Sequence, residues 1–570
     1  MNQRVNNYYL WLSVSLIVTL YYGVVSYYYA SSYDYIVQDD VRQHIVWLQK
    51  YIDPELFPND IIADYFQKLA PLGFKNFYYW AAKAGIEPVS LSKIIPTILA
   101  IATTIYSYLF CLKIIPRASC AFLSTLFINQ LMWLNDDLIS ATPRAFLYPL
   151  LAGFLYYLST NSLIPCLVLM LLQGLFYPHI LLIEMTVLSL RLLAIERNRF
   201  KLISDKQPYI WWTLGAIVTV IALLPLIQKP PELATVLTAE QMRQMPEFHP
   251  GGRTPFFGIG WLWLKYLFIE NSGLSLPFFP TIVWCSLALP WLLKTKLPTV
   301  NLITNKIAIL FQVTIASLLM FILSHLTLPL LHLPSRFTYH SLRVVLGFTT
   351  AIVLTISIDA GKKWFDRKLR SPKLKLLDKI KLALVAVFST AIVVVPGIPF
   401  IFTEFQNWKI GTAAEIYRYL TQQPKDIFVA SLSSEANNIP AFTLRSILVG
   451  DEFAFAYHPA YYSQIERRTV DLLQAQYTSN AAVLKSFIEK YGIDYFLLDR
   501  NAFTPQYLLE KDWLINSSWR ETTEQAIAQL ELNPDPLLSK LSSCSVVSSS
   551  NLDLLSSYCI LDRLQLEDGR

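Results

Sequence analysis

Charged residues are scarce in this chain. Asp, Glu, Lys and Arg make up only 15% of its 570 residues and hydrophobic residues make up 54%, whereas a soluble globular domain is about 25% charged. This shortage excludes a surface that faces water throughout. The sequence also has no basic stripe on a soluble helix and no finger-like Cys/His spacing, so we expect no nucleic-acid partner.

Internal repeats are missing too. The sequence shows no fixed period and no pair of matching halves, features that many transporters have. Cysteine is also rare, and only Cys544 and Cys559 of the six lie outside the apolar two thirds of the chain. These two form a disulfide if that part of the chain lies in an oxidising compartment. Buried free thiols are the alternative.

Long apolar segments are what the sequence does contain. Several windows of about 18 residues or more carry almost no charge, which is long enough for a helix to cross hydrocarbon. The first is longer than the apolar part of a cleaved signal, so we interpret it as an anchor. We predict about eleven spans, at Tyr8–Tyr29, Ser92–Leu112, Ser119–Trp133, Ala145–Leu158, Leu163–Phe176, Ile180–Leu193, Tyr209–Ile227, Pro277–Leu293, Ile307–His325, Val344–Ile358 and Leu382–Phe402.

Charge placement predicts the orientation of these spans. The connections Arg191–Lys206 and Lys362–Lys381 are rich in Lys and Arg, as cytoplasmic loops are, whereas Ser31–Ser90 has more acidic than basic residues. We therefore predict a cytoplasmic N-terminus, as in a protein of a prokaryotic plasma (inner) membrane. The transmembrane domain is expected at residues 1–402, with a long first outer loop at 31–91. An extracytoplasmic α/β domain is expected at 403–570.

Two acidic pairs lie at the predicted outer face. Asp39-Asp40 opens the first outer loop, before an apolar stripe of Val41, Ile45 and Leu48 that predicts a helix along the membrane surface. Asp40 is then either the N-cap of that helix or, like Asp39, a base or metal ligand facing a cavity.

The second pair, Asp136-Asp137, follows the third span and returns to the same face. Arg144 and His179 lie at later turns on this side, where ionisable groups are candidates for a functional site. Each also has a structural alternative: Asp136 caps a short helix, and His179 bonds a carbonyl freed by Pro178.

Arginines mark a late outer loop. Leu333-Pro334-Ser335-Arg336-Phe337 lies in this loop together with Arg343, just before the span predicted from Val344. Arginine suits bidentate contact with phosphate, or alternatively both side chains extend to lipid headgroups. The Pro/Gly-rich outer loop at 229–270 is either a lid over substrate or an ordered surface loop.

In these residues the chain resembles the GT-C glycosyltransferases, polytopic enzymes that take sugar from a polyprenyl-phosphate donor outside the cytoplasm. The resemblance consists of an acidic pair opening a long outer loop, a second pair after the third span and an Arg-bearing late loop. It implies a polytopic α-helical fold with a C-terminal soluble domain. The Trp-Trp-Asp signature of the oligosaccharyltransferase branch is absent from the tail, and the first acidic pair is adjacent rather than spaced.

The resemblance also implies roles. Asp39 or Asp40 is expected to be the base of an inverting hexosyl or pentosyl transfer, which needs one carboxylate. Arg336, Arg343 and Arg144 are expected on the donor phosphate. Asp136, Asp137 and His179 are expected to hold a divalent cation, Mg²⁺ or Mn²⁺. The partners are then the polyprenyl-phosphate sugar, a glycan, lipid or protein acceptor, and membrane lipids.

Two other functions fit the sequence less well. A transporter or flippase for a lipid-linked glycan is disfavoured by the missing repeat and by the scarcity of charges within the spans. A non-catalytic envelope assembly protein would use the acidic pairs only as caps. In the tail, Asp426–Ala430 and Ile493–Leu498 are predicted strands, and Ser463–Tyr477 and Ala481–Tyr491 are predicted helices, the second ending at Gly492.

Overall fold

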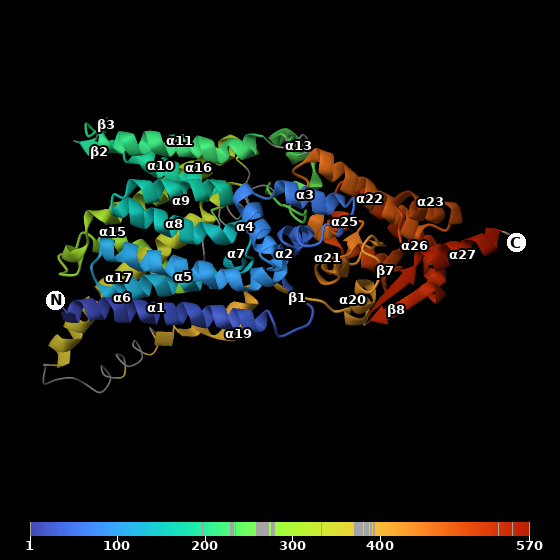
Figure 1. Ribbon diagram of the computed structural model, residues 1–570, viewed down its shortest axis with the longest axis horizontal. Coiled ribbons are helices and arrows are strands. Elements are labelled where there is room, and N and C mark those ends of the chain that lie inside the picture. The colour runs from blue at the N-terminus through green and yellow to red at the C-terminus, as the bar shows by residue number, and fades with distance from the viewer. Residues whose placement is uncertain are drawn as a thin grey trace.

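The protein is elongated, with a helical bundle at one end and a mixed α/β region at the other (Figure 1). In this computed structural model, the described residues are 2–196, 199–228, 235–257, 280–331, 333–369, 394–533, 535–549 and 551–568, with isolated positions between them. The N-terminus lies at the bundle end and the C-terminus at the opposite tip.

Among the described residues, five helices are long and apolar enough to cross a membrane: α1 (Asn2–Tyr29), α5 (Pro88–Ile114), α11 (Gln207–Ile227), α16 (Ala308–Leu326) and α17 (Tyr339–Leu369). Shorter helices complete the described part of the bundle: α6 (Ala118–Trp133), α8 (Pro143–Ser159), α9 (Leu163–Phe176), α10 (Pro178–Leu190), and the 3-10 helix η4 (Thr281–Ala288) with α15 (Leu289–Leu292). A helix therefore lies at ten of the predicted segments. The last, Leu382–Phe402, lies mostly outside the described residues, with η8 (Val395–Gly397) and α19 (Pro399–Glu404) at its end.

Several predicted ends differ from those of the helices: α5 begins at Pro88 and not at Ser92, and α17 ends at Leu369 and not at Ile358. The segment predicted to end at Leu193 stops being helical at Leu190, because a hairpin of β2 (Leu193–Glu196) and β3 (Arg199–Leu202) follows. The segment predicted from Val344 begins at Tyr339. Arg343 therefore lies within the first turns of α17 and not in the loop before it.

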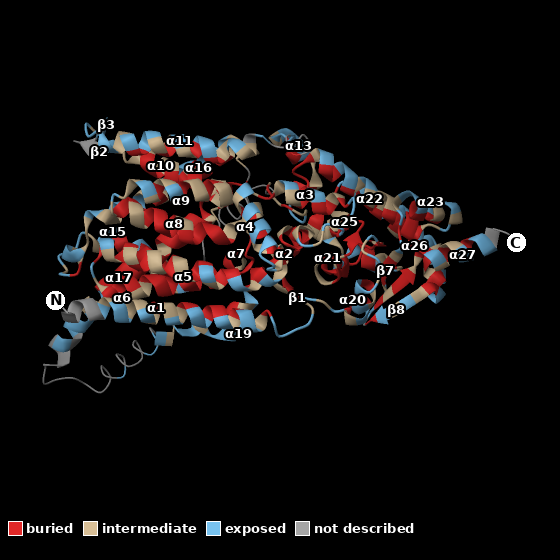
Figure 2. Ribbon diagram, viewed as in Figure 1, coloured by how far each residue is buried: buried red, intermediate tan, exposed pale blue. Residues whose placement is uncertain are grey.

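The side chains exposed on the outside of the bundle indicate which medium surrounds it. Large apolar side chains are exposed on the outside of α1, α11 and α16, among them Ile17, Val24, Ile217, Val220 and Ile322, while the side chains between helices are buried (Figure 2). A soluble monomer rarely exposes so much contiguous apolar surface. The bundle is therefore that of an integral membrane protein.

Small and polar residues join α1, α5 and α6. A Cβ on Gly23 would come within 2.5 Å of the Thr97 side chain, so the two helices approach closely there. The hydroxyl of Thr104 lies 2.8 Å from that of Thr19 and accepts from Asn129 Nδ2 at 2.9 Å. Such hydrogen bonds between helices stabilise packing where lipid supplies no hydrophobic driving force.

The first outer loop folds into β1 (Ile36–Gln38), α2 (Asp39–His44), η1 (Val46–Tyr51), α3 (Ile61–Leu69) and α4 (Leu72–Lys83). The prediction of one surface helix running to Leu48 was wrong. The α-helix ends at His44, and Val41, Ile45 and Leu48 are all buried. Asp60 is the N-cap of α3 and accepts from two backbone N–H groups.

Strand β1 pairs antiparallel with β4 (Trp408–Ile410), in the register Ile36↔Ile410 and Gln38↔Trp408. This two-stranded sheet joins the residues after the first helix to those after the last one. It fixes where α2 begins, because Asp39 N donates to the carbonyl of Asn407 at 3.1 Å.

The tail contains a five-stranded sheet in the order β6-β5-β7-β9-β8. Its strands are β5 (Phe428–Ala430), β6 (Ser446–Ile447), β7 (Tyr495–Asp499), β8 (Ser545–Ser549) and β9 (Leu552–Ser556). Strand β5 is parallel to its neighbours β6 and β7. Strand β9 is antiparallel to both of its neighbours, β7 and β8. The two predicted strands are present as β5 and β7.

Helices surround this sheet (Figure 1). They are α20 (Ala414–Thr421), α21 (Ile439–Thr443), α22 (Pro459–Tyr477), α23 (Ala481–Tyr491), α24 (Pro505–Leu509), α25 (Asp512–Ile515), α26 (Arg520–Leu532) and α27 (Ser557–Asp568). The two predicted helices are present, α22 beginning four residues before Ser463, and Gly492 ends α23 at a φ of 63°. Gly492 thus has the left-handed conformation that glycine adopts readily.

Cys544 and Cys559 form a disulfide, with Cα atoms 5.5 Å apart. The bond joins the end of the 3-10 helix η11 (Leu537–Cys544) to α27, across the β8–β9 hairpin. Of the two alternatives for these thiols, the structure has the bonded one.

Replacing Cys559 by Ser is expected to lower the free energy of unfolding of the tail by about 3 kcal/mol, the entropic value for a loop of this length. Thermal unfolding of the purified full-length protein measures the loss. Cys285→Ser, at a free cysteine, is the matched control. An equal melting temperature for Cys559→Ser and the wild type would contradict this role of the bond.

Candidate active site

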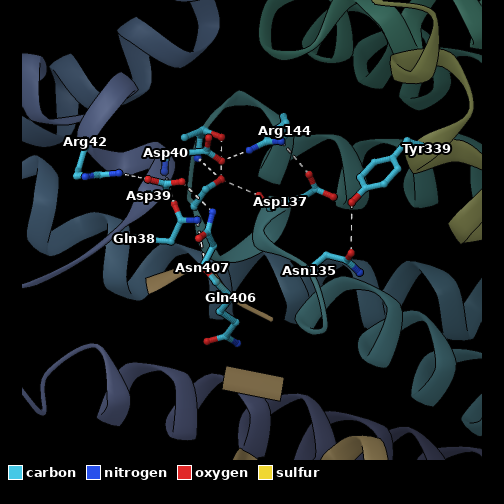
Figure 3. A network of polar contacts seen from close by, with 12 residues as sticks. Gln38, Asp39, Asp40, Arg42, Asn135, Asp137, Arg144, Tyr339, Gln406 and Asn407 are labelled. Atoms are coloured by element: carbon cyan, nitrogen blue, oxygen red, sulfur yellow. Dashed lines mark hydrogen bonds and ion pairs between the residues drawn. The ribbon is translucent and has the colours of Figure 1, made fainter. Parts of the chain in front are cut away.

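Polar side chains from four segments meet where the bundle joins the tail (Figure 3). Asp39 and Asp40 lie on α2, and Asp137 on α7 (Asp136–Ile139), between α6 and α8. Arg144 lies in the first turn of α8, directly after Pro143. The fourth segment is η7 (Pro334–Phe337) with the start of α17.

The N-cap of α2 determines whether the carboxylate of Asp40 is occupied by backbone N–H groups. The side chain of Gln38 is the cap and accepts from Asp40 N at 2.8 Å. The interpretation of Asp40 as a cap is therefore wrong, and its carboxylate points elsewhere. Asp136 is not a cap either, because Asn135 holds that position on α7.

Asp39 and Asp40 point in different directions. Asp39 forms an ion pair with Arg42, accepts from Asn407 Nδ2 at 2.8 Å and lies 3.7 Å from Lys409 Nζ. Asp40 forms an ion pair with Arg144. Asp39 thus contacts residues beside and in strand β4, and Asp40 contacts helix α8 of the bundle.

Arg144 connects the two acidic pairs. One terminal nitrogen contacts Asp40 Oδ2, and the other lies 3.2 Å from Asp137 Oδ1. Asp40 and Asp137 come from segments nearly a hundred residues apart, and a single guanidinium lies between their carboxylates (Figure 3).

Asp137 is fully buried and surrounded by donors. Its Oδ2 accepts from Arg343 Nη1 at 2.5 Å and from the Tyr148 hydroxyl at 3.2 Å, and lies 3.5 Å from His340 Nδ1. Burial raises the pKa of Asp137, but His340 and Arg343 outweigh it, so the pKa lies well below its usual range. Asp137 is therefore ionised at neutral pH.

Asp136, the neighbouring residue, differs. Among the described residues it forms no ion pair. Burial and the negative charge of Asp137 raise the pKa of Asp136 to about 6. The two members of the pair thus have unequal environments.

Arg343 was expected on phosphate, but its contacts are internal. It is 2% exposed, pairs with Asp137, donates to Asn135 Oδ1 at 2.8 Å and stacks over the Tyr339 ring at 3.3 Å. Arg336 differs from Arg144 and Arg343 in that no carboxylate of the described residues lies within ion-pair distance of it. It hydrogen-bonds with Tyr177.

His44 belongs to the site, although nothing in the sequence singled it out. It lies one helical turn after Asp40, with its ring edge-on to Phe66 at 5.6 Å. Burial lowers the pKa of His44 to about 4, with a contribution from the positive charge of Arg336. The i, i+4 spacing from Asp40 is the signal that could have revealed it. His340 could have been found in the same way, from its spacing to Arg343.

The expected metal ligands do not come together as a set. His179 lies between aromatic rings, 5.1 Å from that of Tyr177 and 5.4 Å from that of Phe337 by centroids. Within the described ranges, no group of three His, Cys, Asp or Glu side chains is placed to hold a metal ion. Asp137 is instead enclosed by arginine and histidine.

The tail reaches the site through Arg42. Its Nη1 donates to Asn438 Oδ1 at 2.8 Å, and its Nη2 lies 3.8 Å from Glu452 Oε2. Glu452 in turn accepts from Arg253 at 2.8 Å. Arg253 lies in the outer loop predicted as a lid or a surface feature, and the described part of that loop (235–257) is bound to the tail.

The same loop has a second attachment. It contains α13 (Ala239–Gln244) and η2 (Pro246–Phe248). Glu247 is buried, and its Oε1 accepts from the Tyr462 hydroxyl and from the backbone N–H of Ser518 at 2.6 Å. The remainder of the predicted loop lies mostly outside the described residues.

A bundle of apolar helices, with its polar site at one end and an α/β tail over it, defines a class of polytopic membrane protein. No family model and no curated protein sequence matches the chain. Its fold does match solved structures.

The Archaeoglobus fulgidus oligosaccharyltransferase, tethered with an acceptor peptide, aligns with a TM-score of 0.50 and 11% identity over 91% of this chain and 72% of the other. The archaeal oligosaccharyltransferase AglB, in complex with an inhibitory peptide and a dolichol-phosphate, gives the same values. The mycobacterial arabinofuranosyltransferase AftD gives 0.44 and 12%, over 86% of this chain and 36% of its own. The two archaeal structures share the fold of this chain, so the predicted resemblance to the GT-C glycosyltransferases is confirmed at the level of the fold.

Replacing Asp137 by Asn is expected to lower the stability by about 3–5 kcal/mol, because it leaves buried guanidinium groups without their anion. Asp136→Asn is the matched control, with an effect near zero. The double variant Asp137→Asn/Arg343→Met is expected to recover part of the loss. Thermal unfolding in detergent measures all three. Equal losses for Asp136→Asn and Asp137→Asn would contradict the ion-pair geometry.

The stability of the protein is expected to fall below pH 6.5, in part through His44. Between pH 6.5 and about 4 the unfolded chain binds a proton at this imidazole that the folded protein does not, so stability declines as the pH falls. His44→Gln is expected to flatten the melting temperature across this range, with His249→Gln as the control. Identical slopes for His44→Gln and the wild type would refute it.

Proposed function

We propose that the protein is a membrane glycosyltransferase that moves a sugar from a polyprenyl-phosphate donor to an extracytoplasmic acceptor, with inversion at the anomeric carbon. The observation that carries this proposal is the geometry at the end of the bundle. Two carboxylates, those of Asp40 and of the ionised Asp137, lie on either side of Arg144 and near Arg336, which has no carboxylate partner among the described residues. The GT-C-like fold supports it.

Asp40 is the base. An inverting displacement needs one carboxylate to take the proton of the acceptor. The side chain of Asp137 is 0% exposed and that of Asp40 is 17% exposed, so Asp40 is the one that an acceptor can reach. Asp39 is as exposed as Asp40, and each pairs with one arginine. Asp39 also accepts from Asn407 and lies 3.7 Å from Lys409 Nζ, so we assign it a positioning role.

Arg336 binds the donor phosphate. The leaving group gains negative charge in the transition state, and a guanidinium stabilises it. Arg144 and Arg343 were expected to share this role, but both are neutralised by carboxylates of the protein. The phosphate therefore finds its positive charge at Arg336, and the Tyr177 hydroxyl beside it is a further polar contact.

The topology follows from the sequence. We place the N-terminus in the cytoplasm, about eleven spans at residues 1–402 and the domain at 403–570 outside, as the charge distribution predicts. The Cys544–Cys559 bond supports an oxidising compartment for the tail. Because the site adjoins the tail, it then opens on the outer face, where a lipid-linked donor and its acceptor meet.

The proposal is tested with full-length protein in nanodiscs and a panel of labelled hexosyl and pentosyl polyprenyl phosphates. Loss of label from the lipid is expected with one of them. Asp40→Asn is expected to lower the transfer rate about 10²–10⁴-fold, the usual contribution of a general base. Asp39→Asn keeps the shape and hydrogen-bonding capacity of its side chain and is expected to lower the rate far less.

Arg336 provides the second arm of the test. Arg336→Met is expected to reduce transfer by about 10²-fold or more, in the range found for loss of one transition-state charge contact, and Arg336→Lys less. Unchanged transfer in a folded Asp40→Asn variant would remove Asp40 as base. Label that crosses the bilayer without leaving its lipid would instead indicate a flippase.

A further inference from the structure

Three carboxylates at the site are neutralised by arginines and not by a metal ion. Three carboxylates, those of Asp39, Asp40 and Asp137, each form an ion pair with a guanidinium, from Arg42, Arg144 and Arg343 respectively. A divalent cation binds where carboxylate oxygens carry unbalanced negative charge. At least one oxygen of each of these three carboxylates lies within ion-pair distance of an arginine nitrogen.

The position of Arg144 is the main argument against a metal ion between the two acidic segments. Its two terminal nitrogens contact one oxygen of each carboxylate, Asp40 Oδ2 and Asp137 Oδ1. A metal ion between these two carboxylates would need the place that the guanidinium occupies. It would also lie against a permanent positive charge, because a guanidinium is not deprotonated in proteins.

Arg144 is fixed in this position by the fold. It follows Pro143, which starts α8, and its side chain is only 18% exposed. The second oxygen of Asp137 is occupied by Arg343 and Tyr148. The donor set predicted for the metal, Asp136, Asp137 and His179, therefore does not fit a divalent cation.

We propose that Arg144 takes the place of a divalent cation, so that the protein binds neither Mg²⁺ nor Mn²⁺ here and transfers sugar without one. This inference rests on the proposed function for its activity arm only. The guanidinium holds the two acidic segments together and orients Asp40 for the acceptor. Arg144 is thus a positioning residue whose charge, and not only its size, is required.

Binding of Mn²⁺ to the full-length protein in nanodiscs tests the inference without any sugar substrate. Electron paramagnetic resonance is expected to find no bound Mn²⁺ in the wild type at micromolar concentrations. Arg144→Met removes the charge, and this variant is expected to gain one Mn²⁺ that Asp137→Asn in the same background abolishes. Arg520→Met, at the exposed Arg520–Glu524 pair of α26, is the matched control and is expected to gain none.

The activity arm compares transfer in EDTA with transfer in Mg²⁺ or Mn²⁺. The wild-type rates are expected to agree within about twofold, since no metal supplies transition-state stabilisation here, and Arg144→Lys is expected to keep part of the rate. Stoichiometric Mn²⁺ in the wild type, lost in Asp137→Asn, would overturn the inference, as would transfer that EDTA abolishes and Mn²⁺ restores. If Arg144→Met does not fold, the wild type and Arg144→Lys still decide it. If no donor is consumed, the proposed function fails, and the Mn²⁺ titration alone decides about Arg144.

Discussion

A carboxylate with no exposure to solvent must be surrounded by positive charge and hydrogen-bond donors, and Asp137 has this requirement. Its partners come from α8 and α17, so burying one charge fixes the relative positions of three segments of the bundle. Arg144 extends this arrangement to Asp40 in the first outer loop. A second set of ion pairs, in which Arg42 contacts Asp39 and Glu452, connects the neighbouring residue Asp39 to the tail.

The same ion pairs give different surroundings to residues that look equivalent in the sequence. Asp39 and Asp40 are adjacent in the chain, yet one faces strand β4 and the other faces α8, because successive residues of α2 point about 100° apart. Arg336 and Arg343 are seven residues apart, but only the second has a carboxylate partner among the described residues. Arg336 thus differs from the arginines that pair with carboxylates, and in the proposed function its charge is the one that the substrate neutralises.

Much of the bundle could be predicted from the sequence, because length and apolarity suffice to define a helix in lipid. Strands β5 and β7 were predictable as short apolar runs followed by turns. The first outer loop was not: Val41, Ile45 and Leu48 have the spacing of a surface helix but are buried, because α3, α4 and α5 pack against this stretch. The orientation of Gln38, whose Nε2 donates to the carbonyl of Gln406 at 3.3 Å, and the partner of Arg343 depend on contacts between distant segments, which no local pattern encodes. The convergence of Asp40 with Asp137 was predictable only from topology, since both follow outward spans.

The pairing of β1 with β4 has a consequence for synthesis. Strand β1 emerges from the ribosome with the first outer loop, but its partner is made only after the last apolar segment, more than 350 residues later (Ile36↔Ile410). Asn407, which orients Asp39, arrives at the same late moment. The chain therefore carries Asp39 long before its contacts with Asn407 and Lys409 can form. A product that ends between Leu369, the end of α17, and Trp408 would carry the helices of the site but lack strand β4.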